Sequence, residues 1–314
     1  MVTFLEFEKP VAELEARIKE LKGSSSSLDI APEVEKLEAK ASKLLRDTYA
    51  KLTPWQKTMV ARHPARPHFK DIVGRLIEDF TPLAGDRKFA EDAAIQAGLG
   101  RFRGQPVMVM GHEKGSDTAS RIKHNFGMGK PEGYRKAARL MELADRFNVP
   151  IITFVDTSGA FPGVQAEERG QAEAVARSTQ ACLSVGVPFV AAIVGEGGSG
   201  GALALATANR IIMFEHSVYA VISPEGCASI LWRTADKAAD AAEAMKQTAQ
   251  DLKRLGVIDT IVEEPLGGAQ RAPEEAIDRL GDAVAHELQQ LSGLTPAQLK
   301  ADRRGKFLAM GRAA

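Results

Sequence analysis

The sequence predicts an α/β fold in which parallel strands are covered by helices on both faces. Short apolar runs alternate with amphipathic helical segments through the middle of the chain. Two of these runs, residues 149–155 and 187–194, are mainly apolar, as expected for strands that are buried on both faces. Each run leads into a glycine-rich segment and then into a helix. In open α/β folds, ligands bind at strand ends of this kind.

Length and composition agree with this fold class. The chain has 314 residues, of which 44% are hydrophobic and 26% charged, and 41 Lys and Arg balance 41 Asp and Glu. This length corresponds to about one or two domains with a sizeable core. Zero net charge argues against a protein that binds nucleic acid over its whole surface. No apolar stretch approaches the roughly 18–20 residues of a membrane span.

The N-terminal sequence and the two cysteines indicate in which cellular compartment the protein is expected. The N-terminal sequence MVTFLEFEKP lacks the basic and apolar segments of a secretory signal. Cys182 and Cys227 have no paired spacing, which argues against a disulfide scaffold and against a zinc ribbon. We therefore expect a cytoplasmic protein with no metal site of its own.

Two charged helical segments begin the chain. Apolar residues recur at steps of three and four along residues 10–22 and 32–48, and Gly23 and the serines 24–27 separate the two segments. Each segment has a single narrow apolar stripe, too thin for a domain core. We predict a helical hairpin within residues 1–61 that packs on its own body or on a partner.

The next segment, RHPARPHF (62–69), is predicted to be a connector. The histidines at 63, 68 and 112 do not have the spacing of metal ligands on a helix, so we expect solvated side chains there. Beyond it, residues 106–111 are predicted as a short buried strand and residues 133–147 as an amphipathic helix.

From residue 149 onward, strands and helices alternate regularly. We predict strands at 149–155, 187–194, 210–214, 218–222 and 257–262, and turns at 156–163 and 195–201. We predict helices at about 165–185, 235–255, 273–292 and 295–310, and a helix of small residues at 202–208. The core is expected to span residues 62–268, and residues 269–314 form a helical extension.

The segment GEGGSGG (195–201) has the strongest chemical pattern in the chain. Gly195, Gly197 and Gly200 match the GxGxxG motif of dinucleotide-binding proteins, and Glu215 follows 20 residues after the first glycine. An NAD(P)-dependent oxidoreductase is therefore one hypothesis. Against it, at least two predicted strands precede the motif, and the chain beyond residue 223 is nearly all helix.

Three hydrolytic or nucleotide-binding patterns fit less well. Ser199 lies in a GxSxG sequence like the nucleophile elbow of α/β-hydrolases, but neither later histidine follows a suitable acid on a strand-end loop. No P-loop sequence occurs. Ser158 also stands where an aspartic-protease loop needs glycine.

The glycines themselves suggest another chemistry. Five of the seven residues 195–201 are glycine, and ALALA follows. At the start of a helix such residues leave backbone N–H groups unblocked, where the helix dipole also favours negative charge. The pattern therefore indicates a site that stabilises a developing anion through backbone N–H groups.

Several segments together resemble one known family, the α subunits of bacterial acetyl-CoA carboxylase carboxyltransferases. The similar segments are FLEFEKPVAELEARI (4–18), NFG (125–127), PEGYRKA (131–137), VDTSGAFPGVQAEERGQ (155–171), GEGGSGGALA (195–204), SPEGCASILW (223–232) and EPLGGAQR (264–271). They span essentially the whole chain. Ser158 departs from the pattern, since the family more usually has proline there.

The resemblance implies a crotonase-like fold of repeated ββα units with an N-terminal helical hairpin and C-terminal helices. It implies transfer of a carboxyl group from N-carboxybiotin, held on the biotin carboxyl carrier protein, to acetyl-CoA, which gives malonyl-CoA for fatty-acid biosynthesis. The family's zinc-ribbon β subunit would complete the site in an α2β2 heterotetramer and supply most of the CoA site. A separate biotin carboxylase would use ATP to carboxylate the biotin. A non-catalytic scaffold for the β subunit stays an alternative.

The resemblance also implies roles for particular residues. The N–H groups of Gly200 and Gly201 would hold the ureido oxygen of biotin. The implied neighbours in the biotin pocket are Gly159, Ala160, Gly163, Gly198 and Ser199. The biotin anion can itself accept the methyl proton of acetyl-CoA, so no side-chain base is required.

Two further features remain outside this scheme. Cys227 is expected to be a buried packing residue. The basic cluster Arg121, Lys123 and His124 either meets CoA phosphates or is solvated, and the sequence does not decide between these two.

Overall fold

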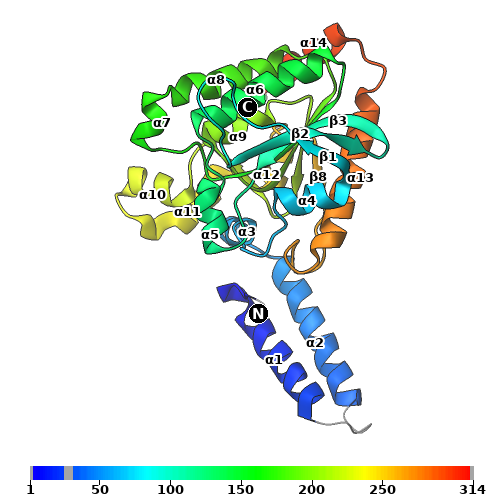
Figure 1. Cartoon of the computed structure of the whole chain (residues 1–314). Coiled ribbons are helices and arrows are strands. Elements are labelled where there is room, and N and C mark those ends of the chain that lie inside the picture. Colours follow the sequence, from blue (N-terminus) through cyan, green and yellow to red (C-terminus); the bar gives the residue numbers. More distant parts are fainter. Residues whose placement is uncertain (1–2, 25–30, 312–314) are drawn as a thin grey trace.

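The computed structural model describes residues 3–24 and 31–311, and it is built around one mixed sheet of eight strands (Figure 1). The strand order is β1-β2-β3-β4-β5-β6-β8, and β7 pairs with the end of β5. The strands are β1 (Ile77–Pro82), β2 (Ile95–Phe102), β3 (Gln105–His112), β4 (Ile151–Thr157), β5 (Phe189–Gly198), β6 (Arg210–Phe214), β7 (Val218–Ala220) and β8 (Thr260–Val262). The predicted α/β class is confirmed.

The larger part of the sheet is parallel, as the apolar runs predicted. All pairings from β3 through β4, β5 and β6 to β8 are parallel, and so is that of β5 with β7. The antiparallel strands β1 and β2 were not predicted. They contain glycine and polar residues, and several of their residues are exposed, so they form no continuous apolar run.

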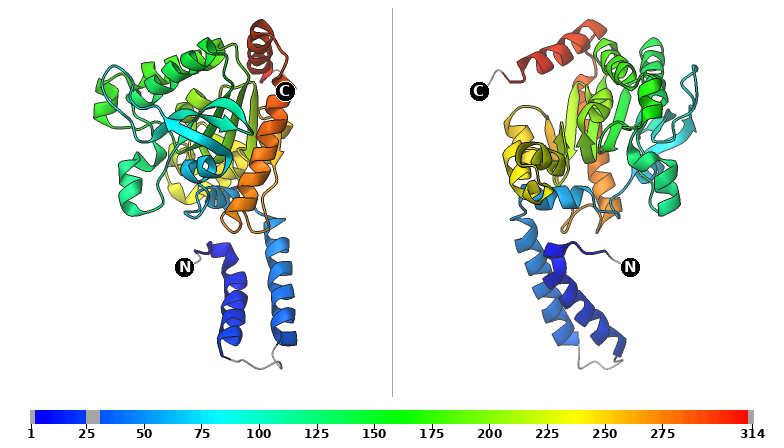
Figure 2. Two further views of the ribbon diagram at one scale, coloured as in Figure 1. Left: turned by 45° about the vertical axis from the view of Figure 1, so that its right-hand side comes forward. Right: turned by 90° about the vertical axis from the view of Figure 1, so that its left-hand side faces the viewer.

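Helices cover both faces of this sheet (Figures 1 and 2). The helices are α1 (Lys9–Ser24), α2 (Ala31–Tyr49), α3 (Pro54–Ala61), α4 (Phe69–Leu76), α5 (Thr118–Lys123), α6 (Pro131–Arg146), α7 (Val164–Glu168), α8 (Gln171–Ser184), α9 (Ser199–Ala206), α10 (Pro224–Trp232), α11 (Ala238–Met245), α12 (Ala249–Arg254), α13 (Pro273–Leu291) and α14 (Pro296–Ala309). Among the described residues, none of these helices combines the length and apolarity of a membrane span.

Each face of the sheet has its own hydrophobic core. On one face, alternate strand residues such as Ile151 and Ala191 pack against α6, α8, α9 and α12. On the other face, the intervening residues, such as Ile152 and Val190, pack against α4 and α13. This alternation along β4 and β5 follows from the two-residue period of a strand, and it explains why both runs are apolar throughout.

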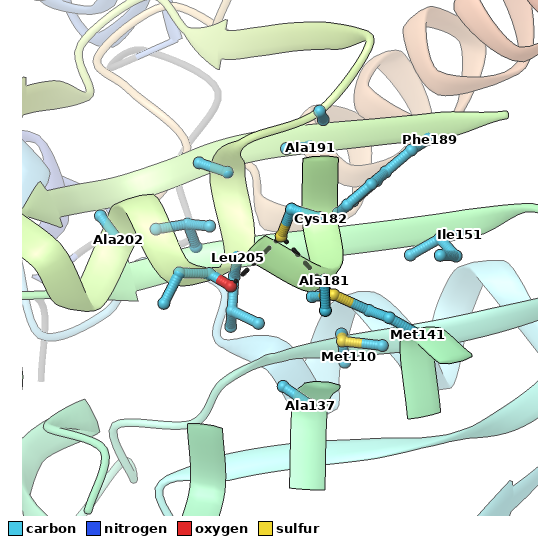
Figure 3. Close-up of a cluster of buried hydrophobic side chains, with 14 of the residues drawn as sticks. Met110, Ala137, Met141, Ile151, Ala181, Cys182, Phe189, Ala191, Ala202 and Leu205 are labelled. Atoms are coloured by element: carbon cyan, nitrogen blue, oxygen red, sulfur yellow. Dashed lines mark hydrogen bonds between the residues drawn. The ribbon is translucent and has the colours of Figure 1, made fainter. Parts of the chain in front are cut away.

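Cys182 lies in the first of these cores (Figure 3). Its Sγ is 3.5 Å from Met141 Sδ and 3.4 Å from the carbonyl oxygen of Ala204. Burial raises the pKa of the Cys182 thiol to about 12, so this cysteine is an inert packing residue. Cys227, in contrast, is only half-buried on α10, so the prediction that it is buried was wrong.

The predicted N-terminal helices are present as α1 and α2, which project from the body of the molecule (Figure 2). Helix α1 continues through Gly23 to Ser24, and the serines 25–27 of the predicted break lie outside the described residues. The base of the hairpin packs on the body through a small cluster that includes Val11, Tyr49 and Val60. The division into residues 1–61, 62–268 and 269–314 stays a prediction.

Several predicted elements have different bounds. The predicted helix 165–185 is two helices, separated at Gly170, whose φ is +80°. The predicted helix 235–255 is also interrupted, at Lys246, whose φ is +52°. The predicted turn 195–201 was wrong, because β5 runs on through Gly198, where β7 pairs with it, and α9 begins at Ser199. Helix α10 was not predicted.

The connector was predicted to have solvated side chains, and this was wrong. Arg66 is almost fully buried, and so are all three histidines for which solvated side chains were expected, His63, His68 and His112. The Arg66 guanidinium makes a bidentate ion pair with Glu264 at 2.8 and 2.9 Å and also donates to the carbonyl oxygen of Val194. Glu264 lies 198 residues further along the chain, so local composition does not indicate this pairing.

The buried Arg66–Glu264 pair makes stability depend on pH. Burial by itself raises the pKa of Glu264, but the Arg66 charge and its hydrogen bonds outweigh burial and lower the pKa from 4.5 to about 2. Because the pKa of Glu264 is lower in the folded protein than in the unfolded chain, the ionised carboxylate stabilises the fold at pH values above 4.5. This stabilisation is lost as pH falls from 4.5 toward 2. We expect this group to contribute about 3 kcal/mol to the free energy of unfolding at pH 7.

Denaturant unfolding at pH 7, 4 and 3 measures this contribution. Glu264→Gln cannot titrate, so its unfolding free energy is expected to change less between pH 7 and 3 than that of the unmodified protein. At pH 7 the variant is also expected to be less stable by about 3–5 kcal/mol, because the buried Arg66 charge loses its partner. The same pH dependence in both proteins would contradict the assignment.

Candidate active site at the ends of two parallel strands

The two predicted glycine-rich segments meet at one edge of the sheet. Strands β4 and β5 are parallel neighbours, so their carboxyl ends lie side by side. The loop 158–163 follows β4, and α9 follows β5 directly. This brings the start of α9 against the loop after β4.

Backbone contacts join α9 to this loop. A Cβ atom on Gly201 would lie 2.7 Å from both the amide nitrogen of Ala160 and the carbonyl carbon of Gly159. A Cβ atom on Gly198 would overlap the carbonyl group of Ser158. The side chain of any other residue would therefore push the two segments apart. Gly200 differs, since its Cβ would meet only Val175 Cγ1, at 3.2 Å.

The amino end of α9 presents backbone donors. Gly198 is the N-cap and provides no side-chain cap, and the first N–H groups of a helix have no intrahelical acceptor. Ser199 has a φ of +52°, an unfavourable conformation for a residue other than glycine, and such strain is concentrated at functional sites. The N–H of Ala160 lies beside Gly201 and makes no hydrogen bond within the described residues.

Hydrogen bonds fix the loop opposite α9. The hydroxyl of Thr157 donates to the carbonyl oxygen of Gly159 at 2.8 Å and accepts from its N–H at 3.1 Å. The Gln171 amide donates to the carbonyl oxygens of Gly129 and Phe161, both at 2.9 Å. These bonds hold the Ala160 N–H in place. The sequence does not indicate this role of Gln171, because its two acceptors lie on other segments.

Of the implied biotin-pocket residues, four lie at this contact and one lies further away. Gly159, Ala160, Gly198 and Ser199 flank the amino end of α9. Gly163 is the N-cap of α7, where a Cβ atom would meet the ring of Phe161. Among the described residues, the atoms nearest to a Cβ at Gly163 belong to Phe161 and not to α9.

A buried carboxylate ties the strand ends together. Asp156 Oδ1 accepts the N–H of Glu196 at 2.9 Å and is 2.6 Å from Lys114 Nζ. Burial raises the pKa of Asp156, but Lys114 and the hydrogen bonds outweigh this and hold it well below its ordinary value. The ionised side chain therefore joins β4 to β5 and to the segment that follows β3. The sequence does not indicate this role of Asp156, since both partners are distant in the chain.

A pocket with a volume of about 350 Å³ opens beside Ser158, and we call it the lateral pocket. Charged and aromatic side chains of both signs dominate its walls: Arg62, His68, Lys114, Arg121, Phe126, Asp156 and Glu196. Arg62 is paired with Glu196 at 2.7 Å and with Glu225 at 2.6 Å. Ser158 thus separates this pocket from the N–H groups of α9.

The geometry does not support the alternative chemistries. No histidine in the described residues hydrogen bonds to Ser199, and His216 is buried against Tyr49, so a hydrolase triad is not formed. Gly195 and Gly197 lie within β5, so the tight turn of a dinucleotide-binding motif is missing. Within residues 3–24 and 31–311, no group of three or more His, Cys, Asp or Glu side chains is placed to hold a metal ion.

Residues 4–311 match the family of acetyl co-enzyme A carboxylase carboxyltransferase-like proteins. The chain belongs to this family. It is 70% identical over 313 residues to the acetyl-coenzyme A carboxylase carboxyl transferase subunit alpha of Rhizorhabdus wittichii. The match covers 99% of this chain and 100% of that protein. Subunits of the same name from Sphingopyxis alaskensis and Zymomonas mobilis are 68% and 65% identical and are covered completely.

Solved structures of carboxyltransferases have the same fold. Transcarboxylase 12S superposes with a TM-score of 0.56 at 19% identity, covering 69% of this chain and 42% of that one. The β subunit of geranyl-CoA carboxylase from P. aeruginosa superposes with a TM-score of 0.54 at 19% identity. The match covers 75% of this chain and 45% of that chain. The crotonase-like fold that the resemblance implied is confirmed.

Proposed function

We propose that this carboxyltransferase is the α subunit of an acetyl-CoA carboxylase, and that it transfers a carboxyl group from N-carboxybiotin to acetyl-CoA. One observation carries the proposal: the backbone contact of Gly198 and Gly201 with the loop after β4. This contact gathers N–H donors at a helix N-terminus without a side-chain nucleophile. The family membership and the full-length relatives support the same activity.

The chain's own part in the reaction is to stabilise charge. Carboxybiotin supplies the carboxyl group and a ureido oxygen that becomes negative when the carboxyl leaves. The N–H groups of Gly200 and Gly201 would donate hydrogen bonds to this oxygen, next to the N–H of Ala160. The dipole of α9 favours the same charge. Removal of one such donor typically lowers a rate by about 10²–10³.

Space at the site supports this assignment. Gly198 and Gly201 lack the Cβ atoms that would fill the contact between α9 and the loop. Ser199 and Gly200 are half-buried, so a ligand can reach the amino end of the helix. Asp156 and Gln171 would act as positioning residues, because they hold the two segments and do not themselves provide the donors.

The proposed partners follow from the α-subunit role. We place the chain in an α2β2 heterotetramer in the cytoplasm, with a zinc-ribbon β subunit, the biotin carboxyl carrier protein and biotin carboxylase. Apolar side chains on and before α10 support a partner surface: Val221, Ile230 and Leu231 are 76%, 71% and 63% exposed. Apolar patches of this kind mark protein interfaces.

Carboxyl exchange in the reverse direction tests the function. The chain is co-expressed with its β subunit, and malonyl-CoA-dependent carboxylation of biocytin is followed as formation of acetyl-CoA. Activity is expected only when both chains are present. An assembled but inactive complex would contradict the proposal. Binding of NAD by the chain would support the oxidoreductase hypothesis instead.

A further inference from the structure

We propose that Tyr134 is a positioning residue of the proposed reaction, whose hydroxyl directs its O–H dipole toward the anion that forms at the amino end of α9. This inference rests on the proposed function, and it adds one side-chain dipole to the backbone donors. It follows from three observations: the hydroxyl is buried, it has no hydrogen-bond partner, and it lies against Gly201.

The hydroxyl of Tyr134 is buried and unpartnered. Tyr134 lies near the start of α6, has no exposed surface, and packs in the same hydrophobic core as Ile95. Its Oη has no hydrogen-bond partner in the described residues. Burial, and to a smaller extent the Asp92 charge, raise the pKa of the hydroxyl, so it keeps its proton and remains a donor.

Packing explains the ring of Tyr134 but not its hydroxyl. A buried hydroxyl without a partner loses its hydrogen bonds to water and gains none in return, which destabilises the fold. Phenylalanine would fill the same core space without this cost. Unpaired polar groups of this kind call for a role outside folding, and they are expected at functional sites.

The position of the hydroxyl is fixed beside α9. A Cβ atom on Gly201 would lie 2.9 Å from Tyr134 Oη, and a Cβ atom on Gly129 would lie 3.0 Å from it. Two glycines therefore enclose the end of the ring and leave it little room to move. The amide nitrogen of Ala160 is 2.7 Å from the same Cβ position of Gly201, so the Tyr134 hydroxyl and this N–H group flank the same residue.

The other polar side chains that hold this region do not offer a free donor. Lys114 Nζ lies 2.6 Å from Asp156 and is already paired. The Gln171 amide group donates to the carbonyl oxygens of Gly129 and Phe161, and only its Oε1 is unpartnered. An amide oxygen accepts hydrogen bonds and therefore does not stabilise an anion.

The basic cluster that the sequence left undecided does not provide this donor either. His124 is buried, and its Nδ1 lies 2.7 Å from the carbonyl oxygen of Ala93, so it is not solvated and has a structural role. Lys123 is exposed. Arg121 lines the lateral pocket, whose walls carry acidic and basic side chains together, so the pocket has no excess of positive charge.

A fixed O–H dipole stabilises charge that forms close to it. The hydroxyl proton rotates about the C–O bond, while packing fixes the position of the oxygen. Such a dipole needs no further reorganisation when the ureido oxygen becomes negative, and its field is strong in a buried region of low dielectric constant. Since the hydroxyl lies behind Gly201 and does not touch the ligand, we expect a smaller effect than that of an N–H donor.

Tyr134→Phe tests the inference in the full chain assembled with its β subunit. In the malonyl-CoA–biocytin exchange, kcat is expected to fall about five- to tenfold. The KM values for malonyl-CoA and biocytin should stay within about twofold, because the dipole acts on charge that develops during the reaction. The denaturant midpoint of unfolding should be unchanged or higher, since the substitution removes an unpartnered polar group.

Tyr49→Phe is the matched control and should have the opposite pattern. The Tyr49 hydroxyl donates to Glu8 Oε1 at 3.1 Å and accepts from Gln270 Nε2 at 3.1 Å, at the base of the helical hairpin. Its removal leaves a buried carboxylate without a donor, so the denaturant midpoint should fall. The exchange kcat should stay within about twofold.

Three results with Tyr134→Phe would overturn the inference. An unchanged kcat would show that the hydroxyl does not act in the reaction. A lower kcat together with a lower denaturant midpoint would show that the hydroxyl serves the fold. A change in KM alone would assign it to substrate binding. If the unmodified complex itself lacked exchange activity, the proposed function would fail and this inference with it.

Discussion

Gly201→Val is expected to lower the rate of carboxyl exchange by about 10²–10³ in the assembled complex. A Cβ atom at this position would lie 2.7 Å from the backbone of Ala160 and 2.9 Å from Tyr134 Oη. Both neighbours are held in place, so α9 must move away from the loop after β4. The N–H donors would then no longer converge, although the substrates could still bind. The measurement is kcat for biocytin carboxylation.

Gly200→Ala is the matched control for this prediction. Its Cβ atom would contact only Val175 Cγ1 at 3.2 Å, and the backbone N–H is retained. We therefore expect a loss of no more than about fivefold, corresponding to an adjustment of about 1 kcal/mol. Full activity of Gly201→Val in a correctly assembled complex would show that the donors lie elsewhere. The scaffold hypothesis would then gain support.

Asp156→Asn is expected to lower the free energy of unfolding by about 3–5 kcal/mol. The amide keeps an acceptor for the N–H of Glu196 but leaves the Lys114 ammonium, 2.6 Å away, without its counter-charge. Because the same side chain joins the strand ends that carry the proposed active site, exchange activity should fall as well. Denaturant unfolding at pH 7 and the exchange assay measure the two effects.

The pH dependence distinguishes a lost charge from a general packing defect. The pKa of Asp156 lies below its ordinary value, so its stabilisation is present at neutral pH and is lost as pH falls through the acid range. The stability difference between Asp156→Asn and the unmodified protein should therefore narrow in acid. Asp278→Asn, which removes an exposed partner of Arg75, is the control and should have little effect. Equal losses in the two variants would contradict the anchoring role.

The parallel part of the fold was predictable because burial on both faces leaves a clear pattern. Residues 149–155 and 187–194 are mainly apolar, and they became β4 and β5. Strands β1 and β2 are partly exposed and contain glycine and charged residues, so their pattern is weak. The long helix predicted at 165–185 was wrong for a related reason. Its amphipathic pattern continues across Gly170, where the backbone turns into the left-handed region.

At the site, residue type was predictable and spatial arrangement was not. Glycine at 195–201 indicated a backbone anion site, because no side chain blocks those N–H groups. Nothing in the sequence showed that Gly201 meets Ala160, since this contact depends on the pairing of β4 with β5. The roles of Asp156 and Gln171 depend on the same pairing.

The sequence by itself determined the α/β class and the order of strand, glycine segment and helix, and it predicted the use of backbone donors in place of a catalytic side chain. These properties follow from local periodicity and from the chemistry of single residue types. Only the tertiary structure decided that Arg66 is buried against Glu264, that Asp156 ties the strand ends together, and that Arg121 faces a pocket beside Ser158. The physical reason is that each of these contacts joins segments far apart in the chain. Whether a charged side chain is solvated, paired or available to a ligand depends on the partners that folding brings to it.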